Sequence, residues 1–385
     1  MKTTEHAAPR PRIVFLVMSA VSPAETVDQL ARALAPHTVL VHHDFTQTPD
    51  FSLASPNVVF VPDPKKTGWA SFGFVEGIFH SLAFALSHLQ FDYLQLLSPT
   101  CLPIRPLAEF ESLVVMGGAE AHFGAIDMRS DLDCMFGVGY RAFTPEKSVR
   151  HRVLRRLSDI YYKSATGRRD EAGVWLRSGG GTGLLGVAIR ALYRTLSIAW
   201  VGQHPFGAGL RPHFGSVWFG ARRHIVEGMV SGFSRPGIRD YFRRLHISEE
   251  FLVPSLLARL VLQKGAFNHY INRFDEAHPS KIDGNDLDIL RASGGYFARK
   301  FPDDPRAPVR LRVLSELFSL PATGLADAMA APADAAPSAT RPGSAHRPAA
   351  APAMTRIAHA VKAARLGLHA AVKPADQRSD HIVGS

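Results

Sequence analysis

Cysteine is almost absent from this sequence, with two in 385 residues. Cys101 and Cys134 are far apart and lack metal-ligand spacing, so we expect neither a disulfide framework nor a zinc site. Long apolar runs are lacking as well. The run Ile13–Met18 is far too short to span a bilayer, and no signal-peptide pattern frames it. These absences predict a protein of a reducing, cytoplasmic compartment, held at most peripherally at the inner membrane.

Acidic residues are in the minority, because 34 Asp and Glu stand against 44 Lys and Arg, a formal net charge of +10. Such an excess favours an anionic partner, either a phosphate, a nucleic acid or an acidic lipid surface. The sequence has no nucleic-acid motif, so nucleic acid is not expected among the partners. Much of the positive charge falls in Arg141–Arg169. That stretch is typical either of a solvated helix face or of a patch that docks on a membrane or an acceptor.

Strand-like and helix-like apolar segments alternate along the first part of the chain. The expected strands are Ile13–Met18, Thr38–His42, Val58–Val61 and Tyr93–Leu97, and the expected helices are Ala24–Leu34 and Phe74–Leu89. With 46% hydrophobic residues, the chain can bury a large core. The alternation predicts an α/β fold with a mostly parallel sheet flanked by helices, whose ligands bind beyond the carboxyl ends of the strands.

Composition divides the rest of the chain. An ordered domain is expected over residues 12–318, after a flexible N-terminus of residues 1–11. Residues 319–353 are rich in Ala and Pro and predict a disordered linker. In the tail, residues 354–385, the basic amphipathic pattern of Met354–Lys373 is typical either of a helix that binds a membrane or partner or of an undocked tail. The glycine-rich run Ser178–Gly183 lacks the Lys-Ser/Thr of a phosphate loop and predicts a lid or hinge.

The strongest local signal for chemistry is Ser248-Glu249-Glu250 at the start of an apolar run that predicts a helix over Ser248–Leu262. Ser248 is a natural N-cap, and the helix dipole favours ionised carboxylates in the first turn. An ionised carboxylate at the edge of a cleft can act as a general base, whereas ordinary helix capping is the alternative. Pro254 lacks an N–H group, so a tight or bent first turn is expected.

Two further groups of residues could bind a charged sugar substrate. Arg299 and Lys300 lie between aromatic residues, with Lys281 upstream, and such cations can stabilise a departing diphosphate without a metal. Surface side chains are the alternative. In the aromatic strand Phe214–Phe219, Gly215-Ser216 would let a ligand approach the backbone and Trp218 could stack on a sugar, or Trp218 could belong to the core.

Two Asp-x-Asp patterns could hold a divalent metal on a diphosphate. They are Asp131-Leu132-Asp133 and Asp286-Leu287-Asp288. A chain of this composition produces about one such pattern by chance, and neither clearly follows a central apolar strand. We therefore expect no metal site and no cofactor, and keep a metal-dependent site at Asp131 and Asp133 as the alternative.

The motifs together resemble the core-2/I-branching enzymes of glycosyltransferase family 14, which also includes the peptide O-xylosyltransferases. The resemblance spans residues from about 12 to 304 and rests on the order and spacing of six segments, Val41–Asp44, Gly68–Ser71, Leu96–Ile104, Gly215–Trp218, Ser248–Phe251 and Phe297–Phe301. It implies a GT-A-like (Rossmann-like) fold and an inverting, metal-independent transfer of a sugar from a UDP-sugar to a hydroxyl of a glycan, lipid-linked or protein acceptor. GlcNAc is the first expectation for the sugar and xylose the second.

The resemblance also implies roles for single residues. Glu250 matches the general base, Lys300 a cation at the leaving diphosphate, and Asp44 the acid near the nucleoside. Arg299 and Lys281 are assigned to the donor side, and the acceptor side receives Gly215, Ser216, Trp218 and Glu249. The sequence departs from the family at two of these motifs: Cys101 replaces the usual Asp before Leu-Pro, and Glu249 replaces the usual Asp before the catalytic Glu. The chain also lacks the transmembrane anchor and many cysteines of vertebrate members, which favours a bacterial-type cytoplasmic enzyme.

Overall fold

The computed structural model describes residues 10–128, 149–161, 166–169, 175–178, 183–245, 247–272, 274–275 and 278–318. All of them belong to the first of two units into which the chain divides, Met1–Asp334. Several sequence predictions lie outside the described residues: the linker and tail, Asp131 and Asp133, and most of the glycine-rich run.

The centre of the fold is a seven-stranded sheet with the strand order β10-β6-β9-β4-β1-β2-β3. Its strands are β1 (Ile13–Ser19), β2 (Thr38–His43), β3 (Val58–Phe60), β4 (Tyr93–Leu97), β6 (Ala121–Asp127), β9 (His213–Arg222) and β10 (Lys264–Gly265). Strand β9 is antiparallel to both of its neighbours, and every other pairing in the sheet is parallel. The predicted α/β fold with a mostly parallel sheet is therefore confirmed.

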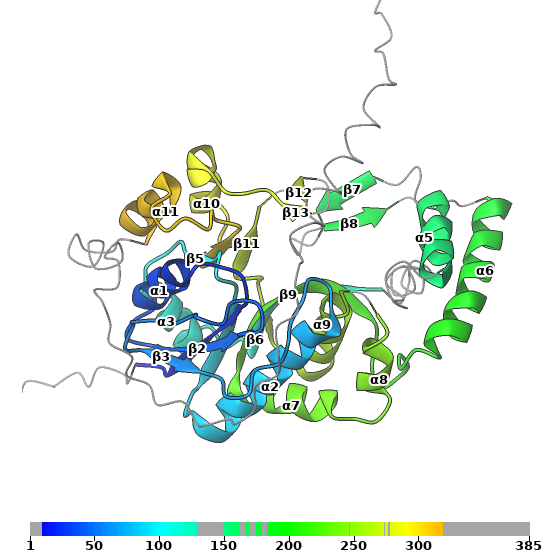
Figure 1. Cartoon of the computed structure of the whole chain (residues 1–385), viewed down its shortest axis with the longest axis horizontal. Helices are drawn as coiled ribbons and strands as arrows, with labels where there is room; N and C mark the ends of the chain where they lie inside the picture. Colours follow the sequence, from blue (N-terminus) through cyan, green and yellow to red (C-terminus); the bar gives the residue numbers. More distant parts are fainter. Residues whose placement is uncertain are drawn as a thin grey trace, which may run out of the picture. The chain divides into compact units, whose positions relative to one another are not determined.

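Helices cover both faces of this sheet (Figure 1). One face carries α1 (Ala24–Ala33), α3 (Leu107–Met116), α10 (Leu287–Ala292) and α11 (Pro308–Arg312), the last continued by one π-helical turn at Val313–Leu317. The other carries α2 (Phe72–His88), α7 (Arg223–Phe233), α8 (Ile238–Phe242) and α9 (Glu249–Leu260). Alternate residues of β1 serve the two cores, since Phe15 packs on the first face and Leu16 on the second.

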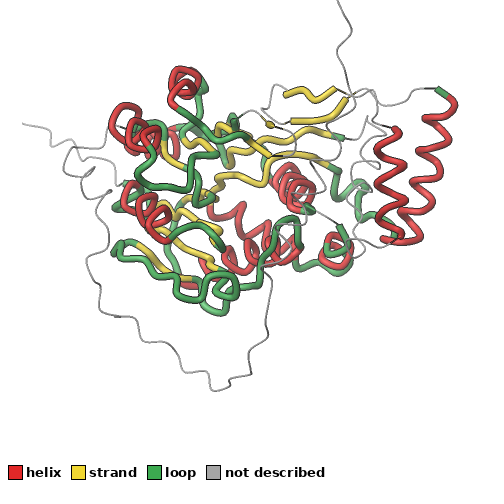
Figure 2. The backbone as a smooth tube through the Cα atoms, turned by 45° about the horizontal axis from the view of Figure 1, so that its top comes forward, coloured by secondary structure: helices red, strands yellow, loops and turns green. Residues whose placement is uncertain are grey.

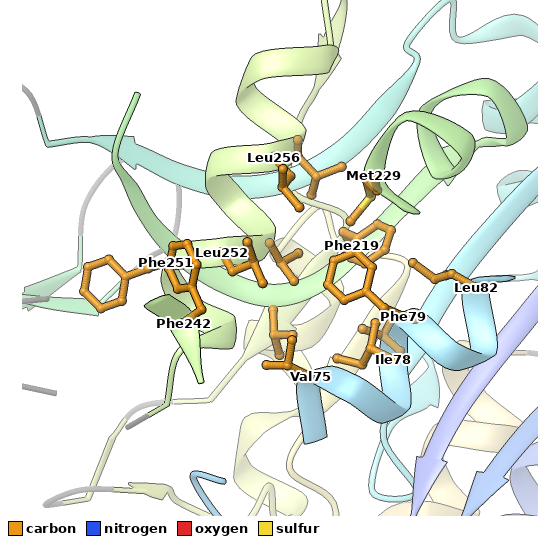
Figure 3. Packing of buried hydrophobic residues seen from close by; sticks show 14 of the residues in the cluster. Val75, Ile78, Phe79, Leu82, Phe219, Met229, Phe242, Phe251, Leu252 and Leu256 are labelled. Carbon is orange, nitrogen blue, oxygen red and sulfur yellow. The ribbon is translucent and has the colours of Figure 1, made fainter. Parts of the chain in front are cut away.

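The core beneath α9 is built from aromatic and branched side chains. Phe219 of β9 packs among Phe79 of α2, Met229 of α7 and Leu256 of α9, as Figure 3 shows. Phe79 also stacks on Phe233, with 4.0 Å between the ring centroids. These contacts fix α9, and therefore the position of Glu250 at its start, against the central sheet.

A small second sheet lies next to the carboxyl end of β4. It has the order β11-β14-β5, formed by β11 (His269–Ile271), β14 (Phe297–Arg299) and β5 (Leu102–Pro103). The backbone N–H of Phe301 donates a hydrogen bond to the carbonyl of Thr100 at 2.9 Å. This sheet therefore brings Arg299 and Lys300 beside the loop that follows β4.

The remaining described elements are short hairpins and a pair of helices, shown as a tube in Figure 2. They are β7 (Thr166–Arg169), β8 (Trp175–Ser178), β12 (Phe274–Asp275), β13 (His278–Pro279), the 3-10 turn Gly284–Asp286, α5 (Val149–Tyr161) and α6 (Leu184–Val201). No helix within the described ranges combines the length and the apolar character needed to cross a membrane.

Candidate active site

The strand order reverses between β1 and β4, and the candidate site begins at this point. Strands β2 and β3 extend the sheet to one side of β1, whereas β4 pairs with its other side. In open α/β sheets, ligands bind outside the carboxyl ends of the strands at such a reversal point. Ser19 and Ser98 mark the two strand ends, and both are buried.

Asp44 follows β2 and ties together two loops at this edge. Its two carboxylate oxygens accept five hydrogen bonds, from the N–H and hydroxyl of Thr46, the amide of Gln47, and the N–H and hydroxyl of Thr67. Burial alone would raise the pKa of Asp44, but these hydrogen bonds outweigh burial and hold the pKa well below its usual range. Asp44 is thus a fixed, buried negative charge beyond the carboxyl end of β2, with its oxygens engaged by the surrounding loops.

Two buried histidines at the end of β2, His42 and His43, precede Asp44 and are held in their neutral state. His42 accepts a hydrogen bond at Nε2 from the N–H of Lys65, at 2.9 Å, and burial lowers its pKa to about 4. His43 stacks on Phe51 with 3.7 Å between ring centroids, and burial lowers its pKa as well. Both buried rings therefore contribute packing and hydrogen bonds at this edge of the sheet rather than charge.

Glu250 lies in the first turn of α9, behind a strained backbone. Ile247 has a φ of 53°, a conformation that β-branched residues rarely adopt, and its N–H donates to the carbonyl of Ala70 at 3.2 Å. Ala70 itself has a φ of 60°. Two motifs far apart in the sequence, Gly68–Ser71 and Ser248–Phe251, are therefore joined directly. Such conformations persist only where surrounding structure enforces them, and they cluster at functional sites.

The predicted cap of this helix is wrong in detail. Ser248 occupies the N-cap position, but its side chain makes no capping hydrogen bond, and no partner for its buried hydroxyl is found among the described residues. Its backbone is already helical, with φ of −67° and ψ of −19°, so the hydroxyl is not directed at the first N–H groups. The helix also continues through Pro254 to Leu260.

Arg299 connects Glu250 to Trp218. Its guanidinium carbon lies 4.6 Å from the centroid of the Trp218 ring. Burial lowers the pKa of Arg299, and the nearby groups Cys101 and Glu250 oppose this shift. The charge of Glu250 is therefore close enough to act on Arg299. The structure thus brings together three predicted residues from three separate motifs.

A neutral thiol–imidazole pair lies next to Arg299. The Cys101 sulfur is 3.3 Å from Nε2 of His269 and 3.1 Å from the hydroxyl of Ser98. Burial raises the pKa of Cys101, and burial followed by the charge of Arg299 lowers the pKa of His269 to about 3. Cys101 stands where the resembled family has Asp, so here Arg299 faces a thiol instead of a carboxylate at this position.

Lys300 and Lys281, both predicted at the diphosphate, belong to one charged cluster with Asp303. Burial and then Arg299 lower the pKa of Lys300, Asp303 opposes this, and Lys281 adds to it. The ammonium nitrogen of Lys281 is 3.7 Å from a carboxylate oxygen of Asp303. Asp303 was not predicted, because nothing in the local sequence separates it from an ordinary surface acid.

Arg310 anchors the segment that carries Asp303, and the sequence analysis missed it too. The side chain is fully buried, and it donates to Gln29 at 2.7 Å and to the carbonyl of Pro302 at 3.1 Å. Burial lowers its pKa to about 10. The hydroxyl of Thr26 also donates to the carbonyl of Asp303. Helix α1 therefore fixes the backbone immediately after Lys300.

The residues assigned to the acceptor side lie along β9 and at the start of α9. A ring contact of 5.2 Å between Phe214 and Phe251 places these two segments side by side. A Cβ at Gly215 would collide with the carbonyl of Gly124 on β6, so the close approach at this glycine is that of a neighbouring strand. Ser216 accepts a hydrogen bond from the N–H of Trp218 at 3.2 Å, and Trp218 and Glu249 are buried.

No protein-family model matches the chain, and no curated protein does. The resemblance to glycosyltransferase family 14 therefore remains a prediction from the sequence motifs.

The second Asp-x-Asp pattern has a structural role. Asp286 is buried and accepts a hydrogen bond from the N–H of Asp283 at 2.9 Å, as part of a capping box around Gly284–Asp286. Asp288 instead pairs with Arg291 at 2.8 Å on the surface. Within the described part of the chain, no three His, Cys, Asp or Glu side chains are grouped so that they could hold a metal ion.

Proposed function

We propose that this protein is an inverting glycosyltransferase that moves a sugar from a UDP-sugar to a hydroxyl acceptor without a metal ion. The observation that carries the proposal is the position of Arg299, which lies on Trp218, interacts with Glu250, and is followed directly by Lys300. A carboxylate whose charge reaches Arg299, and the cation Lys300 that follows Arg299 in sequence, support a site in which a base and cations act together. GT-A-like architecture is part of the same proposal.

In the proposed reaction, the acceptor hydroxyl gives its proton to Glu250 while its oxygen attacks the anomeric carbon. The bond between that carbon and the diphosphate oxygen breaks on the opposite face, and its electron pair leaves with UDP. A single displacement of this kind inverts the anomeric configuration. The barrier falls because the base and the cations act where charge develops, and each contributes only when it is held in place.

Lys300 and Lys281 would neutralise the departing diphosphate. Lys300 is partly buried, and this burial both lowers its pKa and reduces the screening of its charge by water. A less screened cation stabilises a developing anion more strongly. Lys281 forms an ion pair with Asp303, so the incoming diphosphate would compete with Asp303 for this ammonium group.

Trp218 would support the site indirectly. One face of the ring carries Arg299 and the side chain is buried, so it is better suited to hold the guanidinium than to stack on an acceptor sugar. Trp69 fits the acceptor role better, because 69% of it is exposed and it precedes Ala70, whose carbonyl binds Ile247 near Glu250. The acceptor would be a glycan, a lipid-linked sugar or a protein.

The test is the release of UDP from a panel of UDP-sugars, with and without EDTA. Hydrolysis of one donor that survives EDTA would support the proposal and identify the sugar, with UDP-GlcNAc expected first and UDP-xylose second. Loss of activity in EDTA would instead point to a metal-dependent transferase. No turnover, together with strongly salt-dependent binding to a polyanion, would indicate a non-catalytic binding module and overturn the proposal.

A further inference from the structure

Helices α5 and α6 form a two-helix unit on the side of the fold away from α1 (Figures 1 and 2). The two helices contact each other. Their buried stripes include Leu154 of α5 and Ile189 and Tyr193 of α6. Two arginines bridge the pair, since Arg190 lies 5.9 Å over the ring of Tyr161 and Arg150 lies 5.8 Å over the ring of Trp200.

The outer face of α6 is apolar and exposed. Leu184 is 91% exposed and Leu185 70% exposed, and Val187 and Leu192 are exposed as well. The rest of this face consists of small uncharged residues at helical spacing from Leu184, namely Ala188, Ala191, Thr195 and Ala199, all exposed. A continuous apolar helix face of this kind is unusual where a protein surface faces water, and it marks an interaction site.

Positive charge accompanies this face. The two helices contain six arginines and one acidic residue, Asp159. Arg194 is exposed beside the apolar face of α6, Arg190 is half-buried against Tyr161, and Arg152, Arg155 and Arg156 are exposed on α5. An apolar helix face with exposed arginines nearby is complementary to a partner that has negatively charged groups at its surface and an apolar layer below them.

We propose that the outer face of α6 docks on an anionic lipid surface, with the helix lying in the plane of the interface. Leu184 and Leu185 would enter the region between headgroups and acyl chains, while the arginines would bind the lipid phosphates. A second copy of this chain fits less well, because a symmetric contact would bring the arginine-rich borders of both copies together. The proposal does not depend on the identity of the donor or acceptor.

The test is flotation of the full-length protein with two kinds of vesicles, phosphatidylcholine alone and an equal mixture of phosphatidylcholine and phosphatidylglycerol. We expect binding to the anionic vesicles that salt weakens. The double variant Leu184→Glu/Leu185→Glu should bind about tenfold more weakly or worse, since each buried leucine side chain contributes strongly to partitioning. Arg194→Glu should weaken binding as well.

Matched controls are available elsewhere on the surface. Leu262 is 90% exposed but lies after α9, so Leu262→Glu should bind like the unmodified protein. Arg259→Glu makes the same change in net charge as Arg194→Glu and should weaken binding less. Circular dichroism would establish that each variant is folded.

Three results would overturn the proposal. The first is a failure of the unmodified protein to float with anionic vesicles, and the second is equal binding by the α6 variants and their controls. The third is a dimer in sedimentation velocity that Leu184→Glu/Leu185→Glu dissociates, because that result would assign the apolar face to a second copy of the chain.

Discussion

The guanidinium of Arg299 lies over the indole ring of Trp218, with 4.6 Å between Cζ and the ring centroid. Trp218 belongs to the central strand β9, whereas Arg299 belongs to the small sheet beside it. The contact therefore links the two sheets, and the charge of Glu250 partly offsets the lowering of the Arg299 pKa by burial.

Trp218→Phe should reduce kcat/KM by about 2- to 30-fold, because a cation held over an aromatic ring is stabilised by about 0.5–2 kcal/mol and the smaller ring holds it less well. Phe123→Leu is a suitable control, since Lys264 lies over this ring on β6 at 4.9 Å and neither residue has a role in the proposed site. The control should lower thermal stability without changing kcat/KM. Equal kinetic losses in both variants would show that the contact at Trp218 has no special role.

Lys300→Ala should weaken UDP binding by about tenfold or more, because a charge-assisted contact to phosphate is lost. UMP binding should change less, since UMP lacks the second phosphate. Titration calorimetry measures both, with Arg259→Ala as a surface control. A variant that binds UDP as tightly as the unmodified protein would remove Lys300 from the diphosphate site.

Asp303→Asn should have the opposite effect and tighten UDP binding. The substitution removes a negative charge 3.7 Å from the ammonium nitrogen of Lys281 and frees that nitrogen for phosphate. The gain should shrink as salt concentration rises, because both groups are partly exposed. Weaker binding in this variant, measured by the same calorimetry, would mean that Asp303 positions Lys281 instead of competing for it.

Stability should fall between neutral pH and pH 5 because of buried neutral histidines. Burial lowers the pKa of His122 from 6.5 to about 4, so the unfolded chain takes up its proton first as the pH falls. The contribution of His122 to the free energy of unfolding is therefore fully present above the pKa of this residue in the unfolded chain. About 2 kcal/mol of this contribution is lost by pH 5. Urea unfolding should show a smaller loss between pH 7 and 5 for His122→Asn than for the unmodified protein, and an equal loss in both would contradict this account.

Gly215→Ala should destabilise the fold by about 1–3 kcal/mol, because its Cβ would displace the backbone of Gly124 on β6. Gly207→Ala is the control, since no atom lies within 4 Å of the Cβ that it would add. Thermal unfolding distinguishes the two. If Gly215→Ala remained equally stable but bound its acceptor poorly, then the sequence interpretation of a ligand approaching this backbone would be favoured.

The sequence predicted the parallel part of the fold well, because its signals are local. The strand Tyr93–Leu97 and the helix that begins at Ala24 are where apolar periodicity placed them. The antiparallel direction of β9 could not be predicted from local sequence patterns. Its aromatic strand was expected, but pairing direction depends on partners distant in sequence, such as β6 and β4.

Site residues that belong to a continuous motif could be predicted from the sequence. Site residues that only the fold brings together could not. Glu250, Lys300 and Lys281 could be proposed from short patterns. The pairing of Cys101 with His269 joins residues 168 positions apart, and a single histidine in an aromatic segment carries no signal by itself. Arg310 was missed for a similar reason, because a basic residue near the end of a domain usually lies on the surface.

The most direct test of the proposed mechanism is the rate of UDP release by Glu250→Gln, measured with the donor that the unmodified protein turns over. The substitution keeps the shape of the side chain but removes the base, so the rate should fall about 10²- to 10⁴-fold while the affinity for UDP stays unchanged. Glu227→Gln, on the exposed side of α7, should retain full activity. Full activity in Glu250→Gln would contradict the assignment of this residue as the general base.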